Sequence, residues 1–126
     1  MENNEKIKIL IIEDEEMLLN IYATTFQNEG FEVLTATNGA IGLREAFKNL
    51  PQIILLDILL PGGKNGLDVL EELKDNPSTV KIPVMIMSNL ADDITVSEGM
   101  ALGAKGYFPK AQLTPADVVR NVRNLL

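Results

Sequence analysis

Five polar residues each follow a short apolar segment of this sequence. Two acids stand after the first segment, one acid after the third, a serine after the fourth and a lysine just beyond the fifth: Glu13, Asp14, Asp57, Ser88 and Lys110. Taken singly, acids in a first helical turn are typical of capping, and a serine or lysine is typical of a solvated loop. A purely structural role explains Asp57 less well than the other four residues. Asp57 directly follows the apolar run Ile53–Leu56, and burying an unpaired carboxylate is costly.

Taken together, these residues predict a site for a divalent cation and a phosphoryl group. Carboxylates that share a crevice repel each other by on the order of 4 kcal/mol per pair at about 4 Å and an effective dielectric of roughly 20, so they favour a bound cation. Ligands that are all oxygen atoms suit Mg²⁺. A lysine and a hydroxyl opposite the acids would neutralise and hydrogen-bond the phosphoryl oxygens, with Asp57 as the nucleophile.

The composition excludes most other chemistries. The chain of 126 residues has no Cys and no His, which excludes disulfides, the usual zinc sites and Ser–His triads. A net charge of −7 disfavours direct binding to nucleic acids or anionic membranes. Residues 1–5 lack the pattern of a signal peptide and no apolar run is long enough to cross a membrane, so we expect a cytoplasmic protein.

The apolar segments predict five strands buried on both faces, because they are nearly continuous runs of branched aliphatic residues. We expect strands over Ile7–Ile12, Phe31–Ala36, Gln52–Leu56, Val84–Met87 and Gly103–Phe108. Apolar residues at helical spacing predict a helix after each strand: between Asp14 and Gly30, over Ile41–Leu50, over Leu67–Leu73, over Ile94–Leu102, and from the capping residue Thr114 to the end. The fourth helix is weakly patterned, and we expect it to be the most mobile.

Alternating strands and helices predict an α/β fold, in which a parallel sheet carries helices on both faces. Ligands of such sheets bind beyond the carboxyl ends of the strands, where the strand order reverses. The five polar residues can therefore share one edge of the sheet. The length fits one domain, which we expect over residues 6–126 after a disordered tail at residues 1–5.

Four ordered segments resemble the response-regulator receiver domains of two-component signalling, in particular single-domain receivers of the chemotaxis-regulator kind. The segments are Ile11–Glu15, Leu55–Gly62, Val84–Ser88 and Gly103–Lys110, and the resemblance extends over nearly the whole chain. It implies a doubly wound, flavodoxin-like sheet of five parallel strands in the order 2-1-3-4-5.

The resemblance also implies a phosphorelay function. Asp57 would accept a phosphoryl group from a phosphohistidine on a sensor histidine kinase or a histidine phosphotransfer protein. Mg²⁺ would be held by Asp14, Asp57 and the backbone carbonyl of Leu59, with Glu13 acting through a water molecule. A receiver of this kind is not an enzyme, although it assists its own phosphorylation and dephosphorylation.

A change of surface would transmit the signal. By the same resemblance, Lys110 would bridge to the phosphoryl oxygens, Ser88 would move in to bond them, and Tyr107 would follow Ser88 inward. The surface formed by the fourth helix, the fifth strand and the fifth helix would then bind a downstream effector protein or an output domain.

The sequence departs from the family pattern near the site. Glu13 replaces a frequent Asp, and Asn89 stands where a small residue is usual, which would narrow access to Asp57. The loop after Pro61 is one residue longer than the common pattern. Ala111 follows the lysine where many receivers have a proline with a cis bond, and the sequence leaves this peptide open between cis and trans.

Two leucines predict a long-lived phosphoryl group. Leu59 and Leu90 lie two positions beyond Asp57 and Ser88, at positions that flank the path of the attacking water in receivers. Neither side chain can orient water, so we expect slow autodephosphorylation.

Three alternative functions compete with this interpretation. A phosphatase of the haloacid dehalogenase type would need a second acid two residues after its nucleophile, where this chain has Leu59. A flavodoxin-like flavin carrier would bind its phosphate after the first strand, where residues 13–16 are all acidic. A pseudo-receiver, which acts as an interaction module without phosphorylation, remains the main alternative, although the complete set of site residues argues against it.

Overall fold

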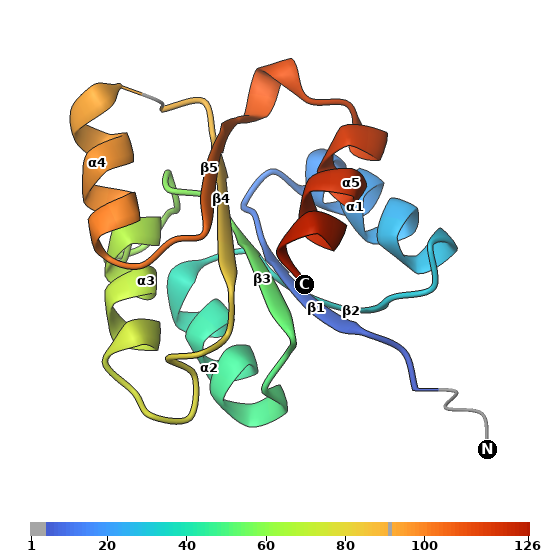
Figure 1. Ribbon diagram of the computed structural model, residues 1–126, viewed down its shortest axis with the longest axis horizontal. Helices are drawn as coiled ribbons and strands as arrows, with labels where there is room; N and C mark the ends of the chain where they lie inside the picture. Colours follow the sequence, from blue (N-terminus) through green and yellow to red (C-terminus); the bar gives the residue numbers. More distant parts are fainter. Residues whose placement is uncertain (1–4, 91) are drawn as a thin grey trace.

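Five apolar segments form a central parallel sheet in the computed structural model, which describes residues 5–90 and 92–126 (Figure 1). The strands are β1 (Lys8–Ile12), β2 (Glu32–Ala36), β3 (Ile53–Leu56), β4 (Val84–Ser88) and β5 (Gly106–Pro109). They pair in the order β2-β1-β3-β4-β5, and every neighbouring pair is parallel. The predicted α/β fold, with its doubly wound, flavodoxin-like sheet in the order 2-1-3-4-5, is therefore confirmed.

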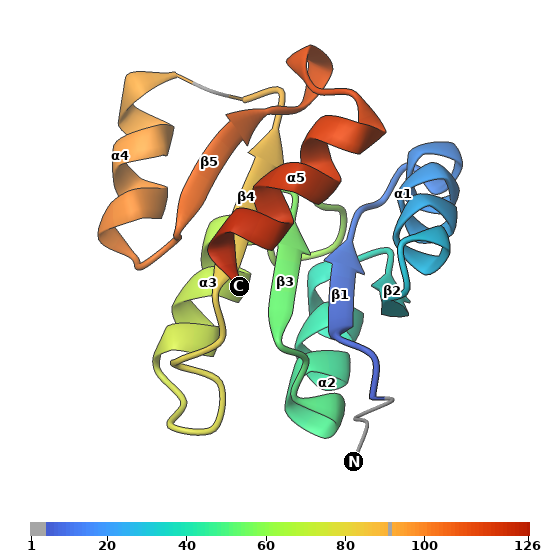
Figure 2. The same ribbon diagram turned by 45° about the vertical axis from the view of Figure 1, so that its right-hand side comes forward.

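Helices cover both faces of this sheet. They are α1 (Glu16–Asn28), α2 (Gly39–Asn49), α3 (Gly66–Lys74), α4 (Asp93–Ala101) and α5 (Pro115–Leu125), and a short 3₁₀ turn, η1 (Lys110–Gln112), lies between β5 and α5. Figure 2 shows α1 and α5 in front of the sheet and α2 and α3 behind it. In the described part of the chain, every helix is too short or too polar to cross a bilayer.

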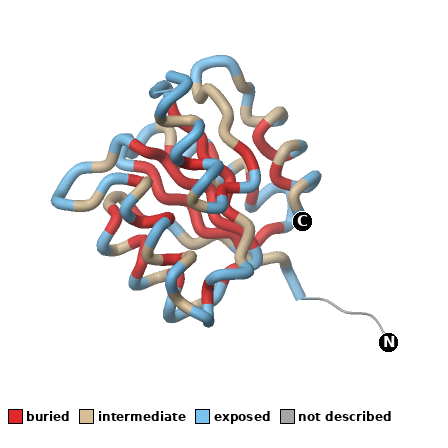
Figure 3. The backbone as a smooth tube through the Cα atoms, turned by 60° about the vertical axis from the view of Figure 1, so that its left-hand side comes forward, coloured by how far each residue is buried: buried red, intermediate tan, exposed pale blue. Residues whose placement is uncertain are grey.

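The strands divide their side chains between two apolar layers because successive residues of a strand point to opposite faces. On one face, Ile9 and Ile11 of β1 pack with the buried side chains of α1 and α5; on the other, Leu10 and Ile12 pack with those of α2 and α3. Figure 3 shows the buried residues concentrated along the strands and the inner helix faces. Packing on both faces of the sheet thus fixes the positions of the carboxyl ends of its strands.

The helix boundaries follow from local capping. Thr114 accepts a hydrogen bond from Asp117 N, as expected of the predicted capping residue, and the Asp117 side chain accepts one from Thr114 N in return. Asn38 caps α2 by accepting a hydrogen bond from Ile41 N, and Asn65 caps α3 with the same reciprocal pair of bonds, to Asp68. In α4 only Gly99 is buried, while Ile94 is 72% exposed, so this helix lies lightly on the sheet. Its expected mobility remains a prediction, and the expected tail lies almost wholly outside the described residues.

Several strand boundaries were predicted wrongly. The first three strands each begin one residue later than predicted, at Lys8, Glu32 and Ile53. The fourth ends at Ser88 rather than Met87, and the fifth spans Gly106–Pro109 rather than Gly103–Phe108. Gly103 instead ends α4: its φ is +107°, and the N–H groups of Gly103 and Ala104 donate to the last helical carbonyls at 3.1 Å. Composition could not separate this helix end from the strand, because glycine and small apolar residues occur in both and only the hydrogen-bond partners differ.

Gly66 lets the loop after β3 fold back onto the start of α3. Its N–H donates to Ile58 O at 2.8 Å, and a Cβ at this position would lie 2.2 Å from Asp57 O and 2.7 Å from Ile58 Cα. Both neighbours are backbone atoms, so the clash cannot be relieved by a side-chain rotation. The position of Asp57 therefore depends on a residue without a side chain.

We expect Gly66→Ala to destabilise the protein by about 1 to 3 kcal/mol, the usual cost of overpacking, even though Ala favours helices. Urea denaturation would measure the change. Gly63→Ala is the matched control, since a Cβ at Gly63 would meet no described atom within 4 Å. Equal denaturation midpoints for the two variants would contradict this view of the loop.

Candidate functional site

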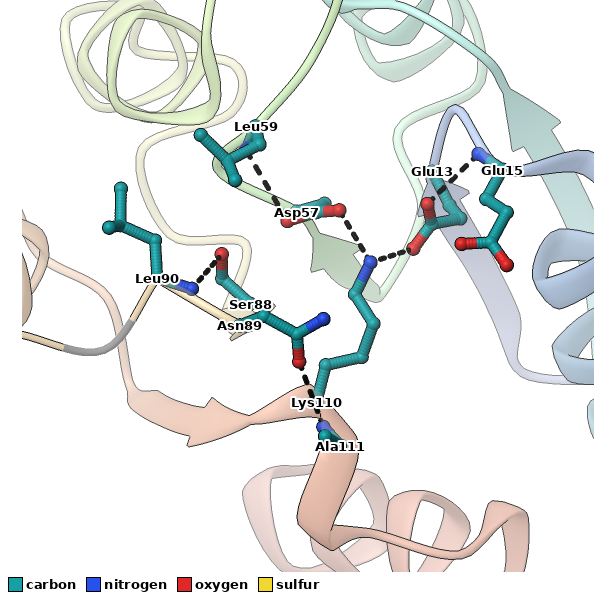
Figure 4. Close-up of polar contacts among 9 residues, drawn as sticks. All are labelled: Glu13, Glu15, Asp57, Leu59, Ser88, Asn89, Leu90, Lys110 and Ala111. Atoms are coloured by element: carbon teal, nitrogen blue, oxygen red, sulfur yellow. Dashed lines mark hydrogen bonds and ion pairs between the residues drawn. The ribbon is translucent and has the colours of Figure 1, made fainter.

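The five polar residues named from the sequence lie together at the carboxyl edge of the sheet. Figure 4 shows four of them, Glu13, Asp57, Ser88 and Lys110. Glu13 and Asp14 follow β1, Asp57 follows β3, Ser88 is the last residue of β4, and Lys110 follows β5. These strands are consecutive neighbours in the sheet, and all of them run in the same direction. Their ends therefore meet, although the residues are up to 97 positions apart in the chain.

Three carboxylates form an acidic cluster. One oxygen atom from each of Glu13, Asp14 and Asp57 lies within 4.8 Å of the others. Glu13 and Asp57 are only 3% and 5% exposed, whereas Asp14 is exposed to solvent. The cluster is thus buried on the sheet side and open on the Asp14 side, which is the arrangement of a cation site with access for water.

Lys110 joins two of these acids. Its Nζ lies 2.7 Å from Glu13 Oε1 and 2.7 Å from Asp57 Oδ2, and its side chain is only 12% exposed. Burial alone would lower the pKa of Lys110, but the hydrogen bonds to Asp57 and Glu13 raise it above the usual lysine value. The ammonium group therefore stays charged at neutral pH.

The pKa of Glu13 is raised even though Lys110 is close. Burial is the largest cause, and it outweighs the opposing hydrogen bonds from Lys110 and from Glu15 N, which lies 3.0 Å from Glu13 Oε2. The pKa values of both partners are thus raised, for different reasons: that of Lys110 by its two acidic partners, and that of Glu13 because its buried carboxylate loses more hydration than one shared ammonium group restores. A second cation at this edge would relieve that cost.

The carboxylate of Asp57 is held at both oxygen atoms. Leu59 N lies 3.3 Å from Oδ1, and Lys110 Nζ binds Oδ2. The structure thus brings the amide of Leu59 to Asp57, while the predicted role of the Leu59 carbonyl as a metal ligand remains a prediction. An oriented, buried and ion-paired carboxylate is suited to nucleophilic attack on an electrophilic phosphorus.

Ser88 and Tyr107 are connected through the loop that follows β4. The side chain of Ser88 is fully buried, and its Oγ accepts a hydrogen bond from Leu90 N at 3.1 Å. The Tyr107 hydroxyl donates to the carbonyl of the same Leu90, and burial raises the pKa of Tyr107. A displacement of the loop at Ser88 would therefore move Leu90, the hydrogen-bond partner of Tyr107 on β5.

The two leucines at the predicted water path are both accessible. Leu59 is 57% exposed and Leu90 is 37% exposed, and Figure 4 shows both on the side of Asp57 away from Glu13. The surface over the Asp57 carboxylate on that side is consequently lined by aliphatic side chains.

The sequence analysis missed two features of the site. Tyr22 of α1, which was not named there, lines a cavity of about 10 Å³ beneath Glu13 and Asp57 and a wider pocket of about 370 Å³ beside Lys110. Asn89 also lines the wider pocket, and its Oδ1 accepts a hydrogen bond from Ala111 N at 3.0 Å. The peptide between Lys110 and Ala111, left open by the sequence, is trans.

Comparisons with known proteins agree with this geometry. A family model described as the response regulator receiver domain matches residues 9–123. Response regulator PleD of Caulobacter vibrioides is 35% identical over 103 residues, covering 82% of this chain and 22% of that protein. Phosphate regulon transcriptional regulatory protein PhoB of Rhizobium meliloti is 31% identical, covering 90% of this chain and 49% of that protein. The chain thus spans about half the length, or less, of these curated relatives.

Among solved structures, chemotaxis protein CheY4 of Vibrio cholerae shares the fold with a TM-score of 0.90 at 23% identity, covering 97% of this chain and 100% of that one. A putative response regulator from Chloroflexus aurantiacus superimposes with a TM-score of 0.87 at 26% identity, covering 96% and 98% of the two chains.

We expect the burial of Tyr22 to be visible in an alkaline titration. Burial, the largest cause, raises its pKa from 10.0 to about 12. A pKa raised by folding contributes stability that is complete below the unfolded value and is lost as the pH rises through the folded value, here from about 10 to about 12. The free energy of unfolding should therefore fall more steeply over this window in the wild type than in Tyr22→Phe.

Ultraviolet absorbance of the phenolate would follow the ionisation directly, since the chain has two Tyr and no Trp. Tyr22→Phe should leave a single transition, that of Tyr107. Loss of a transition near the ordinary tyrosine pKa in this variant would contradict the burial of Tyr22.

Proposed function

The chain belongs to the response-regulator receiver family, and we propose that it accepts a phosphoryl group on Asp57 from a phosphohistidine and transmits the change through its surface. The observation that carries this proposal is the environment of Asp57. Its carboxylate is buried, lies 2.7 Å from the Lys110 ammonium and shares a 4.8 Å cluster with two further acids. In this role the chain is a signalling module rather than an enzyme with a separate substrate.

The chemistry needs no general base. An oxygen of the Asp57 carboxylate forms a bond to phosphorus while the bond from phosphorus to the donor imidazole nitrogen breaks, and the imidazole leaves with the electron pair. The product is an acyl phosphate. These 126 residues contain no His, so the phosphohistidine must lie outside them, on a sensor histidine kinase or a histidine phosphotransfer protein.

The acidic cluster fits Mg²⁺, because it offers only oxygen ligands and one of its acids faces solvent. We expect Asp14, Asp57 and the Leu59 carbonyl to hold the ion, with Glu13 acting through water. When bound, the ion neutralises the acids and the charge on the transferred group. The other contributions come from the protein: Leu59 N orients Asp57, and Lys110 supplies a fixed positive charge.

A hydrogen-bonded loop supports the proposed switch. Ser88 would donate its hydroxyl to the phosphoryl group, and the bonds from Ser88 to Leu90 and from Leu90 to Tyr107 connect that event to β5. The adjoining surface of α4, β5 and α5 includes exposed apolar side chains such as Ile94 and Met100. A downstream effector protein or an output domain would bind there. The pseudo-receiver alternative requires the same fold without phosphorylation, and the experiment below separates the two.

We expect the wild-type protein to gain one phosphoryl mass when it is incubated with Mg²⁺ and a small amidophosphate donor. Intact mass spectrometry measures the gain, and a chelator should abolish it. Asp57→Asn should gain nothing, whereas Asp75→Asn, which changes an exposed acid at the end of α3, should behave as the wild type. A folded wild-type protein that gains no mass would favour the pseudo-receiver.

The phosphoryl group should be lost slowly from the wild type, because the leucines beside Asp57 cannot orient an attacking water. We expect Leu59→Asn or Leu90→Glu to accelerate the loss about tenfold, since a positioned polar group supplies part of the orientation and proton transfer. The decay of the phosphorylated mass after removal of the donor measures the rate. Leu126→Asn, a similar change at the far end of α5, is the control. Equal or faster loss from the wild type would refute the expectation.

A further inference from the structure

Two side-chain hydrogen bonds continue the connection between β4 and β5 beyond the end of the sheet. The paired residues end with Ser88 opposite Pro109, and proline has no N–H to donate. Past this pair, the Tyr107 hydroxyl donates to Leu90 O, and Asn89 Oδ1 accepts from Ala111 N at 3.0 Å. The second bond joins the residue after Ser88 to the residue after Lys110.

The segment that carries Lys110 has little support of its own. It forms the three-residue turn η1, whose closing hydrogen bond, from Leu113 N to Lys110 O, is long at 3.4 Å. The Lys110 side chain nevertheless has to reach Glu13 and Asp57 at 2.7 Å each. The bond to Asn89 is therefore a main restraint on the backbone from which Lys110 extends (Figure 4).

We propose that Asn89 is a positioning residue: by accepting the hydrogen bond from Ala111, it holds the Lys110 segment against the end of β4, so that the ammonium of Lys110 and the hydroxyl of Ser88 face the same phosphoryl group. This inference rests on the proposed phosphorylation of Asp57. The bond requires an N–H at position 111, which a proline would lack. Thus the Asn at position 89 and the Ala at position 111 act as one pair.

The pair also couples two movements. Asn89 lies between Ser88 and Leu90 in the chain, so a shift of Ser88 toward Asp57 pulls on Ala111 unless the bond breaks. The hydroxyl and the ammonium therefore approach or leave the phosphoryl group together. The competing role for Asn89 is that of an obstacle that narrows access to Asp57, and it has the opposite consequence.

The rate of phosphorylation by phosphoramidate, at saturating Mg²⁺, distinguishes the two roles. We expect Asn89→Ala to be slower by roughly threefold to tenfold, the scale of one net hydrogen bond, whereas removal of an obstacle would make it faster. Ala111→Pro should show a similar loss, and the double variant should be no slower than the slower single one. Ala111→Gly keeps the N–H and is the matched control, expected at the wild-type rate.

A Lys110→Ala background tests whether Asn89 acts through the lysine. In that background Asn89→Ala should cause no further loss, while an additional loss of the same size would overturn the proposal. This comparison does not depend on the folding of the proline variant. An unchanged or faster rate for Asn89→Ala in the natural background would overturn it as well.

Amide hydrogen exchange at Ala111 provides a readout independent of phosphorylation. Protection should be lost in Asn89→Ala and kept in Asn89→Asp, which retains the accepting oxygen. Unchanged protection in Asn89→Ala would refute the bond, even in a protein that is phosphorylated normally. A wild type that accepts no phosphoryl group would instead refute the proposed function, and the role of Asn89 in it, while Ala111 exchange still reported the bond.

Discussion

The ammonium group of Lys110 lies between the buried carboxylates of Glu13 and Asp57, at 2.7 Å from each, and this contact joins the ends of β1, β3 and β5. Without it, two carboxylates that are at most 5% exposed would face each other with little solvent. Removing one partner of a buried ion pair is costly, because the remaining charge stays desolvated. The carboxyl edge of the sheet is therefore organised around one positive charge.

The same contact allows the site to respond to a bound cation and a phosphoryl group. Three carboxylates share the edge with the one ammonium group of Lys110, and burial keeps the pKa of Glu13 raised despite that contact. In the proposed function, a cation and a phosphoryl group change that balance, and Lys110 acquires new oxygen atoms to bind. The loop from Ser88 to Leu90 lies next to this change and is bonded both to Tyr107 and to the segment that follows Lys110. A change in charge at the site can thus alter the positions of residues at the surface of β5 and α4.

Local sequence patterns were sufficient to predict which strands and helices form, but not to predict all of their boundaries. The apolar runs predicted all five strands, and the Thr114-Pro115 signal predicted the start of α5, because both depend on residues close in sequence. The start of β5 was wrong, since Gly103 and its neighbours close α4 through bonds to carbonyls of that helix. Whether a buried apolar stretch is strand or helix end depends on its hydrogen-bond partners, which composition does not specify.

The residue types and their spacing determined, by themselves, that an acidic site with one lysine and one serine would stand at the carboxyl ends of a parallel sheet. That inference is possible because parallel strands place equivalent ends on one edge. The tertiary structure alone decided the contacts: that Lys110 bridges Glu13 and Asp57, that Tyr22 lies beneath them, and that Asn89 accepts from Ala111. These pairings join residues from separate strands and helices, so their distances depend on packing and not on order along the chain.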